Sequence, residues 1–146
     1  MADSPVIWRL RGGELTLDRP AVVGVINITP DSFHEASRAV DVDAAVASAL
    51  RMAAEGAAVI DIGAESTRPG AARVDPAEQV RRLKPVLGAL GAAELAIPIC
   101  VDTTRCEVAQ MAIEAGAAAI NDVSGGAEDP ALLDEVAQAG AGLILM

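Results

Sequence analysis

The chain has 146 residues, of which 52% are hydrophobic and 1% aromatic, so its core must be built mainly from Ala, Val, Leu and Ile. This length suits one domain and is too short for two of ordinary size. Twenty-one Asp and Glu against eleven Lys and Arg give a formal net charge of -10, which argues against nucleic acid as a partner.

Cysteine content and hydropathy indicate the compartment. Cys100 and Cys106 are too few for a disulfide framework and too irregularly spaced for a zinc pair, which favours a reducing environment. No charged-then-apolar signal segment opens the chain, and charged residues interrupt each apolar run well before the length of a membrane span. We therefore expect a cytoplasmic protein with no membrane partner.

Hydrophobic periodicity predicts a regular series of elements. Residues 6 to 19 alternate apolar and polar side chains around Gly12-Gly13, which predicts a two-stranded hairpin that would plug the end of a larger unit. Apolar runs predict five strands, at 22–28, 58–63, 97–102, 117–123 and 142–146. Between them we expect four helices, ending near residues 55, 90, 115 and 140.

The helix starts are marked by capping residues. The expected caps are, in chain order, Asp41 or Asp43, Asp75 followed by Pro76, Thr103 or Thr104, and Asp129 followed by Pro130. Pro85 lies inside the second helix and should kink or shorten it.

A glycine followed by a buried strand recurs at three helix exits, at Gly56, Gly116 and Gly140. Asp61 and Asn121 each lie five residues past their glycine, so we expect them at the same height near the carboxyl ends of their strands. Repeated strand–helix units with short connections predict parallel strands. An open doubly wound sheet and part of an eight-stranded barrel both fit, but no glycine-rich phosphate loop follows the first strand, which weakens the former.

Polar side chains stand at the ends of four consecutive predicted strands. They are Asn27 and Asp31, then Asp61 with the loop from Glu65 to Arg68, then Asp102, then Asn121 and Asp122. Catalytic groups of a β/α barrel come from the carboxyl ends of several strands, so this pattern indicates a binding site. As alternatives, Asp102 could be a helix cap and Asn121 a satisfied buried amide.

These positions carry a family resemblance. The segments NITPDSF (27–33), DIGAESTRPG (61–70), VDT (101–103) and INDV (120–123) resemble the successive motifs of the dihydropteroate synthase family, in its order and spacing. The resemblance implies a (β/α)8 TIM barrel, of which this chain would supply one incomplete pterin-binding domain, 1–146. It also implies condensation of p-aminobenzoate with 6-hydroxymethyl-7,8-dihydropterin diphosphate, with Mg2+ on the diphosphate that leaves. Sulfonamides compete with p-aminobenzoate in this family.

The resemblance assigns roles residue by residue. Asp102 and Asn121 would contact the pterin, and Asn27 would be the Mg2+ and diphosphate ligand. Asp61 matches an acidic strand-end position, where it could simply orient the second loop. Thr67 and Arg68 would belong to the second active-site loop, and Phe33 and Pro69 to the wall over p-aminobenzoate. Arg68 would stabilise loop closure or meet an anion.

The chain departs from the family in two ways. His34 to Ser37 replace the usual Ser-Asp-Gly-Gly, which removes two glycines from a loop that has to close. A full barrel needs roughly 250 residues, and the family's second pterin-binding Asp, Ser-x-Lys and Arg-x-His are absent. We therefore predict the amino-terminal part of a longer enzyme, a homodimer when complete, or a fragment that persists only by pairing with another copy. This chain alone would be inactive.

Two other functions stay open from the sequence. The altered first loop is compatible with a pterin-binding protein that lacks synthase activity. A purely structural half-barrel would use the same scaffold and bind no pterin at all.

Overall fold

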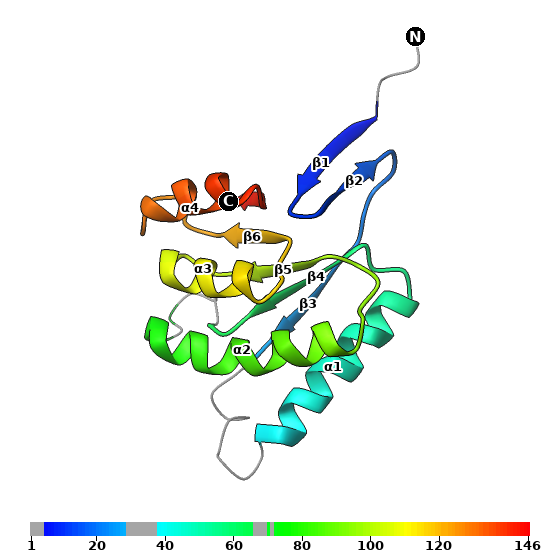
Figure 1. Cartoon of the computed structure of the whole chain (residues 1–146), viewed down its shortest axis with the longest axis horizontal. Helices are drawn as coiled ribbons and strands as arrows, with labels where there is room; N and C mark the ends of the chain where they lie inside the picture. Colours follow the sequence, from blue (N-terminus) through cyan, green and yellow to red (C-terminus); the bar gives the residue numbers. More distant parts are fainter. Residues whose placement is uncertain (1–4, 29–37, 66–69, 71) are drawn as a thin grey trace.

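The computed structural model describes residues 5–28, 38–65, 70 and 72–146, and Figure 1 shows their arrangement. The predicted hairpin, five strands and four helices are confirmed, with strand bounds within about two residues of those expected. The elements are β1 Val6–Leu10, β2 Gly13–Leu17, β3 Val23–Asn27, α1 Arg38–Ala54, β4 Val59–Gly63, α2 Pro76–Ala92, β5 Ile99–Asp102, α3 Cys106–Glu114, β6 Ala119–Asp122, α4 Ala131–Ala139 and β7 Gly142–Leu145.

The main sheet decides between the two candidate architectures. Its order is β3-β4-β5-β6-β7, all neighbours are parallel, and each strand pairs with the next along the chain. A doubly wound sheet would reverse its strand order and place helices on both faces. Here α1 to α4 all contribute to one apolar core on the face of the sheet that carries Ile60, Ile62, Val101 and Ile120. The chain therefore folds as part of a (β/α)8 barrel.

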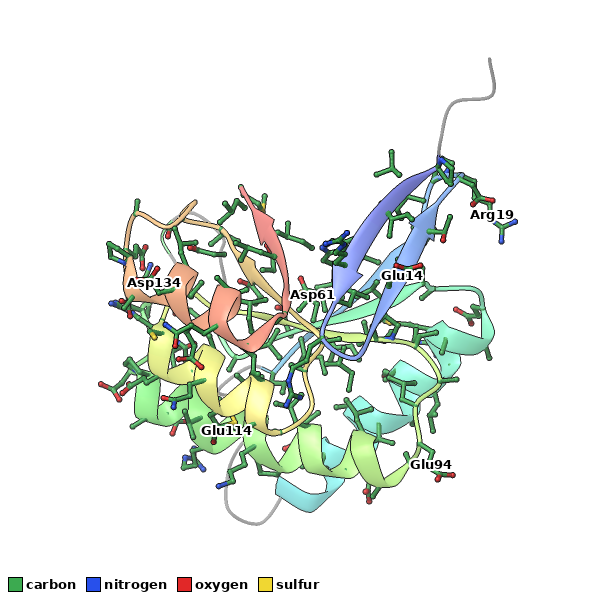
Figure 2. All side chains as sticks on the ribbon, turned by 45° about the horizontal axis from the view of Figure 1, so that its top comes forward. Glu14, Arg19, Asp61, Glu94, Glu114 and Asp134 are labelled. Atoms are coloured by element: carbon green, nitrogen blue, oxygen red, sulfur yellow. The ribbon has the colours of Figure 1, made fainter. Side chains whose placement is uncertain are left out.

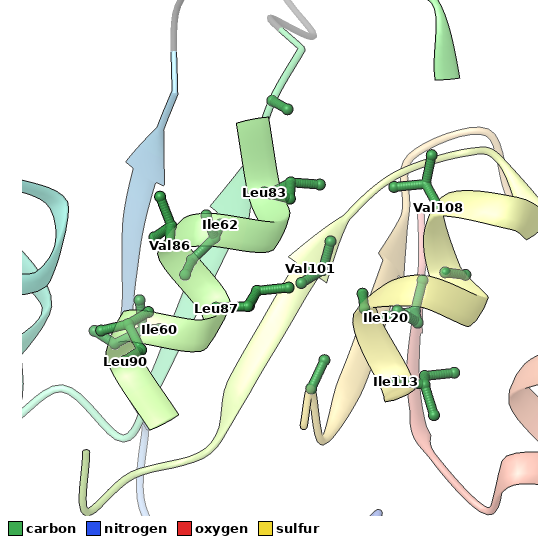
Figure 3. Close-up of a cluster of buried hydrophobic side chains, with 14 of the residues drawn as sticks. Ile60, Ile62, Leu83, Val86, Leu87, Leu90, Val101, Val108, Ile113 and Ile120 are labelled. Carbon is green, nitrogen blue, oxygen red and sulfur yellow. The ribbon is translucent and has the colours of Figure 1, made fainter. Parts of the chain in front are cut away.

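Alternation along each strand separates the core from the other face of the sheet. Ile60, Ile62, Val101 and Ile120 are fully buried against the helices, where α2 contributes a continuous apolar stripe (Figure 3). The intervening residues point to the opposite face, because successive side chains of a strand alternate. That face carries a smaller apolar cluster at the amino ends of the strands, formed by Leu10, Val59, Cys100, Ala118 and Ala119.

The hairpin lies across the amino ends of the strands, as a plug should. β1 and β2 pair antiparallel around a turn at Arg11 and Gly12, where Gly12 has a φ of 82°. The backbone N–H of Arg11 donates to the carbonyl of Ala118 at 3.0 Å, and its guanidinium donates to the carbonyl of Ile113 at 3.1 Å. Leu10 joins the smaller cluster, so apolar packing and hydrogen bonds both fix the hairpin.

Asp75 is the one predicted helix cap that acts as expected, since Arg105, and neither Thr103 nor Thr104, is the residue before α3. Asp75 accepts a hydrogen bond from the N–H of Ala77 at 2.9 Å, and Pro76 opens α2. The first expectation was wrong, since α1 begins at Arg38 and places Asp41 within its first turn. The last was also wrong: Asp129 does not cap α4. Its carboxylate instead accepts from the N–H of Cys106 at 2.8 Å and so caps the neighbouring α3.

Pro85 was expected to kink or shorten its helix, and it does not shorten it. α2 continues past it to Ala92. Pro85 is exposed, whereas Leu83, Val86, Leu87 and Leu90 on either side of it are buried. Most helical stability in a protein comes from packing of the apolar face, so this packing outweighs the loss of one backbone donor on the solvent side.

The two outer strands have a partner on one side only within the described part of the chain. β3 pairs with β4 alone, and β7 pairs with β6 alone. Large apolar side chains are exposed beside both edges, including Val23, Val25, Leu145 and Met146. In the residues described, no helix combines the length and apolarity that a membrane crossing needs.

A candidate ligand site at the carboxyl ends of the strands

The strand register brings three of the predicted site residues onto one line. Asn27 lies opposite Gly63, Gly63 opposite Asp102, and Asp102 opposite Asn121. Residues in register on parallel strands project from the same face of the sheet. Asn27, Asp102 and Asn121 therefore share one rim, at the carboxyl ends of β3, β5 and β6. The prediction that polar strand ends converge is confirmed for these residues.

Asp61 and Asn121 are offset by two residues in strand register. Asp61 lies opposite Val25 and Cys100, and Cys100 lies opposite Ala119, two residues before Asn121. The strands of a barrel are tilted and staggered along its axis, so residues in register do not lie at equal height, and this stagger accounts for an offset of two residues across two strands. The contact between the two side chains agrees with the expectation that they lie at the same height.

Asp61 nevertheless contacts Asn121 directly. The Asn121 amide nitrogen donates to Asp61 Oδ2 at 3.0 Å, and the two residues are only 9% and 6% exposed. An ionised carboxylate only accepts hydrogen bonds, so this contact fixes which end of the amide faces Asp61. Figure 2 shows Asp61 in the middle of the molecule, whereas Glu114 and Asp134 lie at its periphery.

Two oxygen atoms of this pair have unused hydrogen-bonding capacity. Asp61 Oδ1 and Asn121 Oδ1 are buried and have no hydrogen-bond partner within the described structure. Buried polar atoms are seldom left in this state because the desolvation penalty is about 1–3 kcal/mol each. Both atoms are acceptors, so the group that would satisfy them has to present N–H or O–H donors.

Asp102 completes the acidic rim. Burial first, and then the nearby charges of Asp61, Glu65 and Asp122, together raise the pKa of its carboxyl group to about 7. Burial, followed by the charge of Asp61, also raises the pKa of the Cys100 thiol, which stays neutral. Asp102 can thus accept a hydrogen bond when ionised, or donate one when protonated, within the range of ordinary pH.

Gly63 is a site position that the sequence reasoning missed. A Cβ at this residue would lie 3.3 Å from Asn27 Oδ1, 3.4 Å from Asp102 Cβ and 3.6 Å from Asp102 Oδ2. The missing side chain lets Asn27 and Asp102, two strands apart, approach each other. A glycine inside a strand often marks such a close approach, and this signal was available at the end of the 58–63 run.

Asp122 has a local structural role. Its Oδ1 accepts from the N–H and hydroxyl of Ser124, at 2.8 and 2.7 Å, and its Oδ2 accepts from the N–H of Gly126 at 2.7 Å. Asp122 is fully buried and shapes the turn after β6. The remaining predicted positions lie outside the described residues: Asp31, Phe33, the segment His34 to Ser37, Thr67, Arg68 and Pro69.

The donor set at the rim suits a hard cation with few protein ligands. Asn27 Oδ1 and Asp102 Oδ2 lie 3.3 and 3.6 Å from the position that a Cβ at Gly63 would take. Among the described residues, the rim included, no group of three or more His, Cys, Asp and Glu is arranged to hold a metal ion, so protein oxygens alone would supply few ligands. Mg2+ takes oxygen ligands, keeps several waters, and is commonly bound by one or two protein oxygens with substrate phosphates. The residues present fit that pattern.

A parallel strand–helix barrel with polar side chains gathered at the carboxyl ends of its strands defines a small-molecule-binding barrel protein. The particular family follows from comparison with known proteins. The family model described as pterin binding enzyme matches residues 23–146, so the chain belongs to the pterin-binding enzyme family.

Individual relatives agree with this assignment. The dihydropteroate synthase of Mycobacterium leprae is 49% identical over 125 residues, which are 86% of this chain and 43% of that protein. The Synechocystis enzyme of the same name is 45% identical over 128 residues, covering 88% and 44%. The chain thus spans less than half the length of these relatives.

Solved structures give the same result. The Xanthomonas albilineans dihydropteroate synthase with 4-aminobenzoic acid superposes with a TM-score of 0.81 at 47% identity, covering 94% of this chain and 50% of that one. The Yersinia pestis dihydropteroate synthase in a sulfonamide drug complex gives 0.82 at 40% identity, covering 97% and 50%. The resemblance found in the sequence motifs is confirmed.

Proposed function

We propose that this chain forms the amino-terminal half of a dihydropteroate synthase. The complete protein would condense 6-hydroxymethyl-7,8-dihydropterin diphosphate with p-aminobenzoate in folate biosynthesis, releasing diphosphate. Family membership over residues 23–146 supports the proposal. The observation that carries it is the buried acceptor group at the rim, where Asp61 and Asn121 retain unpaired oxygens beside Asp102.

Pterin recognition would use these acceptors. The pterin edge presents an amidine-like row of N–H donors, and a carboxylate can accept two such bonds. Asp102 and Asn121 would bind this edge from adjacent positions on β5 and β6. Asp61 would hold the Asn121 amide with its oxygen toward the ligand, because its own carboxylate takes the amide N–H. This gives Asp61 a more definite task than orienting the second loop.

The diphosphate would lie nearer β3. Asn27, at the carboxyl end of that strand, would hold Mg2+ through its amide oxygen, with Asp102 Oδ2 close by. Mg2+ would supply positive charge that stabilises the departing diphosphate. Gly63 keeps the space between the two strands open for these groups.

The arylamine half of the site is proposed from the resemblance. Phe33, Thr67, Arg68 and Pro69 would cover p-aminobenzoate, and Arg68 would help to close the loop or meet an anion. Support comes from the related Xanthomonas structure, which contains 4-aminobenzoic acid, and from the Yersinia structure, which is a sulfonamide drug complex. We further propose a cytoplasmic homodimer that sulfonamides inhibit.

Two measurements on the complete gene product test the proposal. Calorimetric titration with the pterin diphosphate, Mg2+ present, should give heat, and diphosphate release should require p-aminobenzoate. Heat without diphosphate release would favour a pterin-binding protein that is not a synthase, which the altered His34 to Ser37 segment keeps as the second candidate. No heat at all would favour a structural half-barrel and overturn the proposal.

A variant pair separates the site from general charge effects. Asp61→Asn leaves the Asn121 amide without its carboxylate partner and should weaken pterin binding by on the order of tenfold or more, since hydrogen bonds to charged groups are worth about 1.5–3 kcal/mol. Glu114→Gln makes the same chemical change at an exposed position at the end of α3 and should leave binding unchanged. Equal affinities in both variants would remove Asp61 from the site.

A further inference from the structure

A buried glutamine lies behind the rim, outside the positions assigned so far. Gln79, in the first turn of α2, is only 1% exposed. Its amide nitrogen donates to Glu65 Oε2 at 2.9 Å and to the carbonyl of Val74 at 3.1 Å. Its amide oxygen accepts from the hydroxyl of Thr103 at 3.1 Å. Both ends of the amide are therefore engaged at once.

The three partners belong to the carboxyl-end connections of two neighbouring strands. Glu65 follows β4, Val74 precedes α2, and Thr103 comes directly after Asp102 at the end of β5. Gln79 thus joins the two described ends of the β4–α2 connection to the exit of β5. It does so from α2, whose apolar face is anchored in the core.

The network continues from Thr103 to the ligand residues. The Thr103 N–H donates to the backbone carbonyl of Asn121 at 3.0 Å, and its hydroxyl accepts from the N–H of Arg105 at 3.2 Å. Thr103 is therefore fixed on both sides, by Gln79 from the helix layer and by Asn121 from β6. Asp102 is the residue before Thr103 in the chain, and Asn121 is hydrogen-bonded to Thr103 through its backbone carbonyl.

Packing alone would be served by an apolar residue at this position. The neighbouring helix positions Leu83, Val86 and Leu87 are fully buried, and their apolar side chains form no hydrogen bonds. A buried amide carries a desolvation cost, which its three hydrogen bonds offset. What the amide adds over a leucine is direction: it holds Glu65, Val74 and Thr103 at set distances from one another.

We propose that Gln79 is a positioning residue, which holds Asp102 and Asn121 in register with the β4–α2 connection through Thr103. This inference rests on the proposed function and deepens it, because it assigns part of the precision of the pterin site to a residue that does not contact the ligand. We call the hydrogen bonds of Gln79 to Glu65, Val74 and Thr103 the clamp. Without the clamp the carboxyl end of β5 can move relative to β4, so the positions of Asp102 and Asn121 vary more.

Two near-isosteric variants in the complete gene product test the proposal. Gln79→Leu removes all three bonds, and Thr103→Val removes the hydroxyl that links Gln79 to β5. Each should raise KM for the pterin diphosphate by on the order of fivefold, the equivalent of about one hydrogen bond, while kcat at saturation changes by less than about twofold. Because the two variants share the Gln79–Thr103 bond, the double variant should raise KM by less than the product of the two single effects.

The control is Gln110→Leu, the same exchange on an exposed face of α3, which should leave KM at the wild-type value. All rates are measured well below each variant's melting temperature. A lowered Tm with an unchanged KM would mean that Gln79 only stabilises the fold and would overturn the proposal. Additive effects in the double variant would overturn it as well.

Hydrogen exchange separates this inference from the proposed function. The N–H groups of Thr103 and Arg105 report the clamp without any ligand, and both should exchange faster in Gln79→Leu than in Gln110→Leu. If the wild-type protein neither binds the pterin diphosphate nor releases diphosphate, the proposed function fails while this result still tests the clamp. Equal exchange in the two variants would refute the positioning role.

Discussion

The raised pKa of Asp102 predicts that a side chain at the site destabilises the fold at neutral pH. In the unfolded chain the carboxyl group ionises near 3.8, and in the folded chain near 7. Between these values the folded state keeps a proton that the unfolded state has lost, so stability falls as pH rises through this window. Below it the penalty is absent, and above it the penalty is complete. Asp102→Asn keeps the shape and cannot ionise.

The size of the effect follows from the shift. Roughly three pKa units at about 1.4 kcal/mol each give a ceiling of about 4 kcal/mol. Asp102 is only partly buried, and solvent screening reduces such values. We therefore expect Asp102→Asn to be more stable than wild type by on the order of 1–2 kcal/mol at pH 8, with the difference shrinking towards zero near pH 4.

Urea unfolding at pH 4, 6 and 8, with chelator present to remove divalent cations, measures this directly. Glu114→Gln controls for the loss of one negative charge from a chain whose net charge is -10. A stability difference that does not grow between pH 4 and pH 8 would refute the reasoning. So would an Asp102→Asn variant that is less stable than wild type at pH 8.

Three further predictions follow from close contacts and open edges. Gly142→Ala would place its methyl group 2.6 Å from Leu10 Cδ2 and 3.1 Å from Trp8 Nε1, so it should destabilise by about 1–3 kcal/mol and change the fluorescence of the sole tryptophan. Gly88→Ala, which meets nothing within 4 Å, is its control, and equal urea midpoints would contradict the prediction. Gly63→Ala should displace the two polar side chains beside it and weaken pterin diphosphate binding with Mg2+ by on the order of tenfold; an unchanged calorimetric affinity would disprove this. The 146-residue chain should self-associate through its open sheet edges as concentration rises in gel filtration, and a monomer at every concentration would count against it.

Much of the fold was predictable because its signals are local. Apolar runs and helix-exit glycines located the strands, and Asp75-Pro76 marked the start of α2. The shared rim of Asn27, Asp102 and Asn121 was predictable for the same reason, since the carboxyl ends of consecutive parallel strands lie at the same edge of the sheet. The offset of two residues in strand register between Asp61 and Asn121 was not, because stagger between strands is a property of the closed sheet.

The missed features depend on contacts between distant segments. Asp129 caps α3, whose first turn is 23 residues earlier in the chain, so no rule that looks along one helix could assign it. Gln79 reads as one polar residue on an amphipathic helix, and its role is visible only when Glu65 and Thr103 are placed beside it. The expected shortening at Pro85 was wrong because the free-energy cost of a proline inside a helix is smaller than the stabilisation from the apolar packing around it.

The hairpin at the amino ends of the strands has a practical consequence. Arg11 is hydrogen-bonded to Ala118, and Leu10 packs against the amino ends of β4, β5 and β6, so the hairpin covers these strand ends. In Figure 1, β1 lies on the side away from the arrowheads of β4, β5 and β6, so an affinity tag or fusion partner attached ahead of Val6 and held next to β1 would lie opposite the ligand opening. Immobilising the protein through this terminus should leave small molecules free access, which suits it to surface-based screening for compounds that occupy the rim.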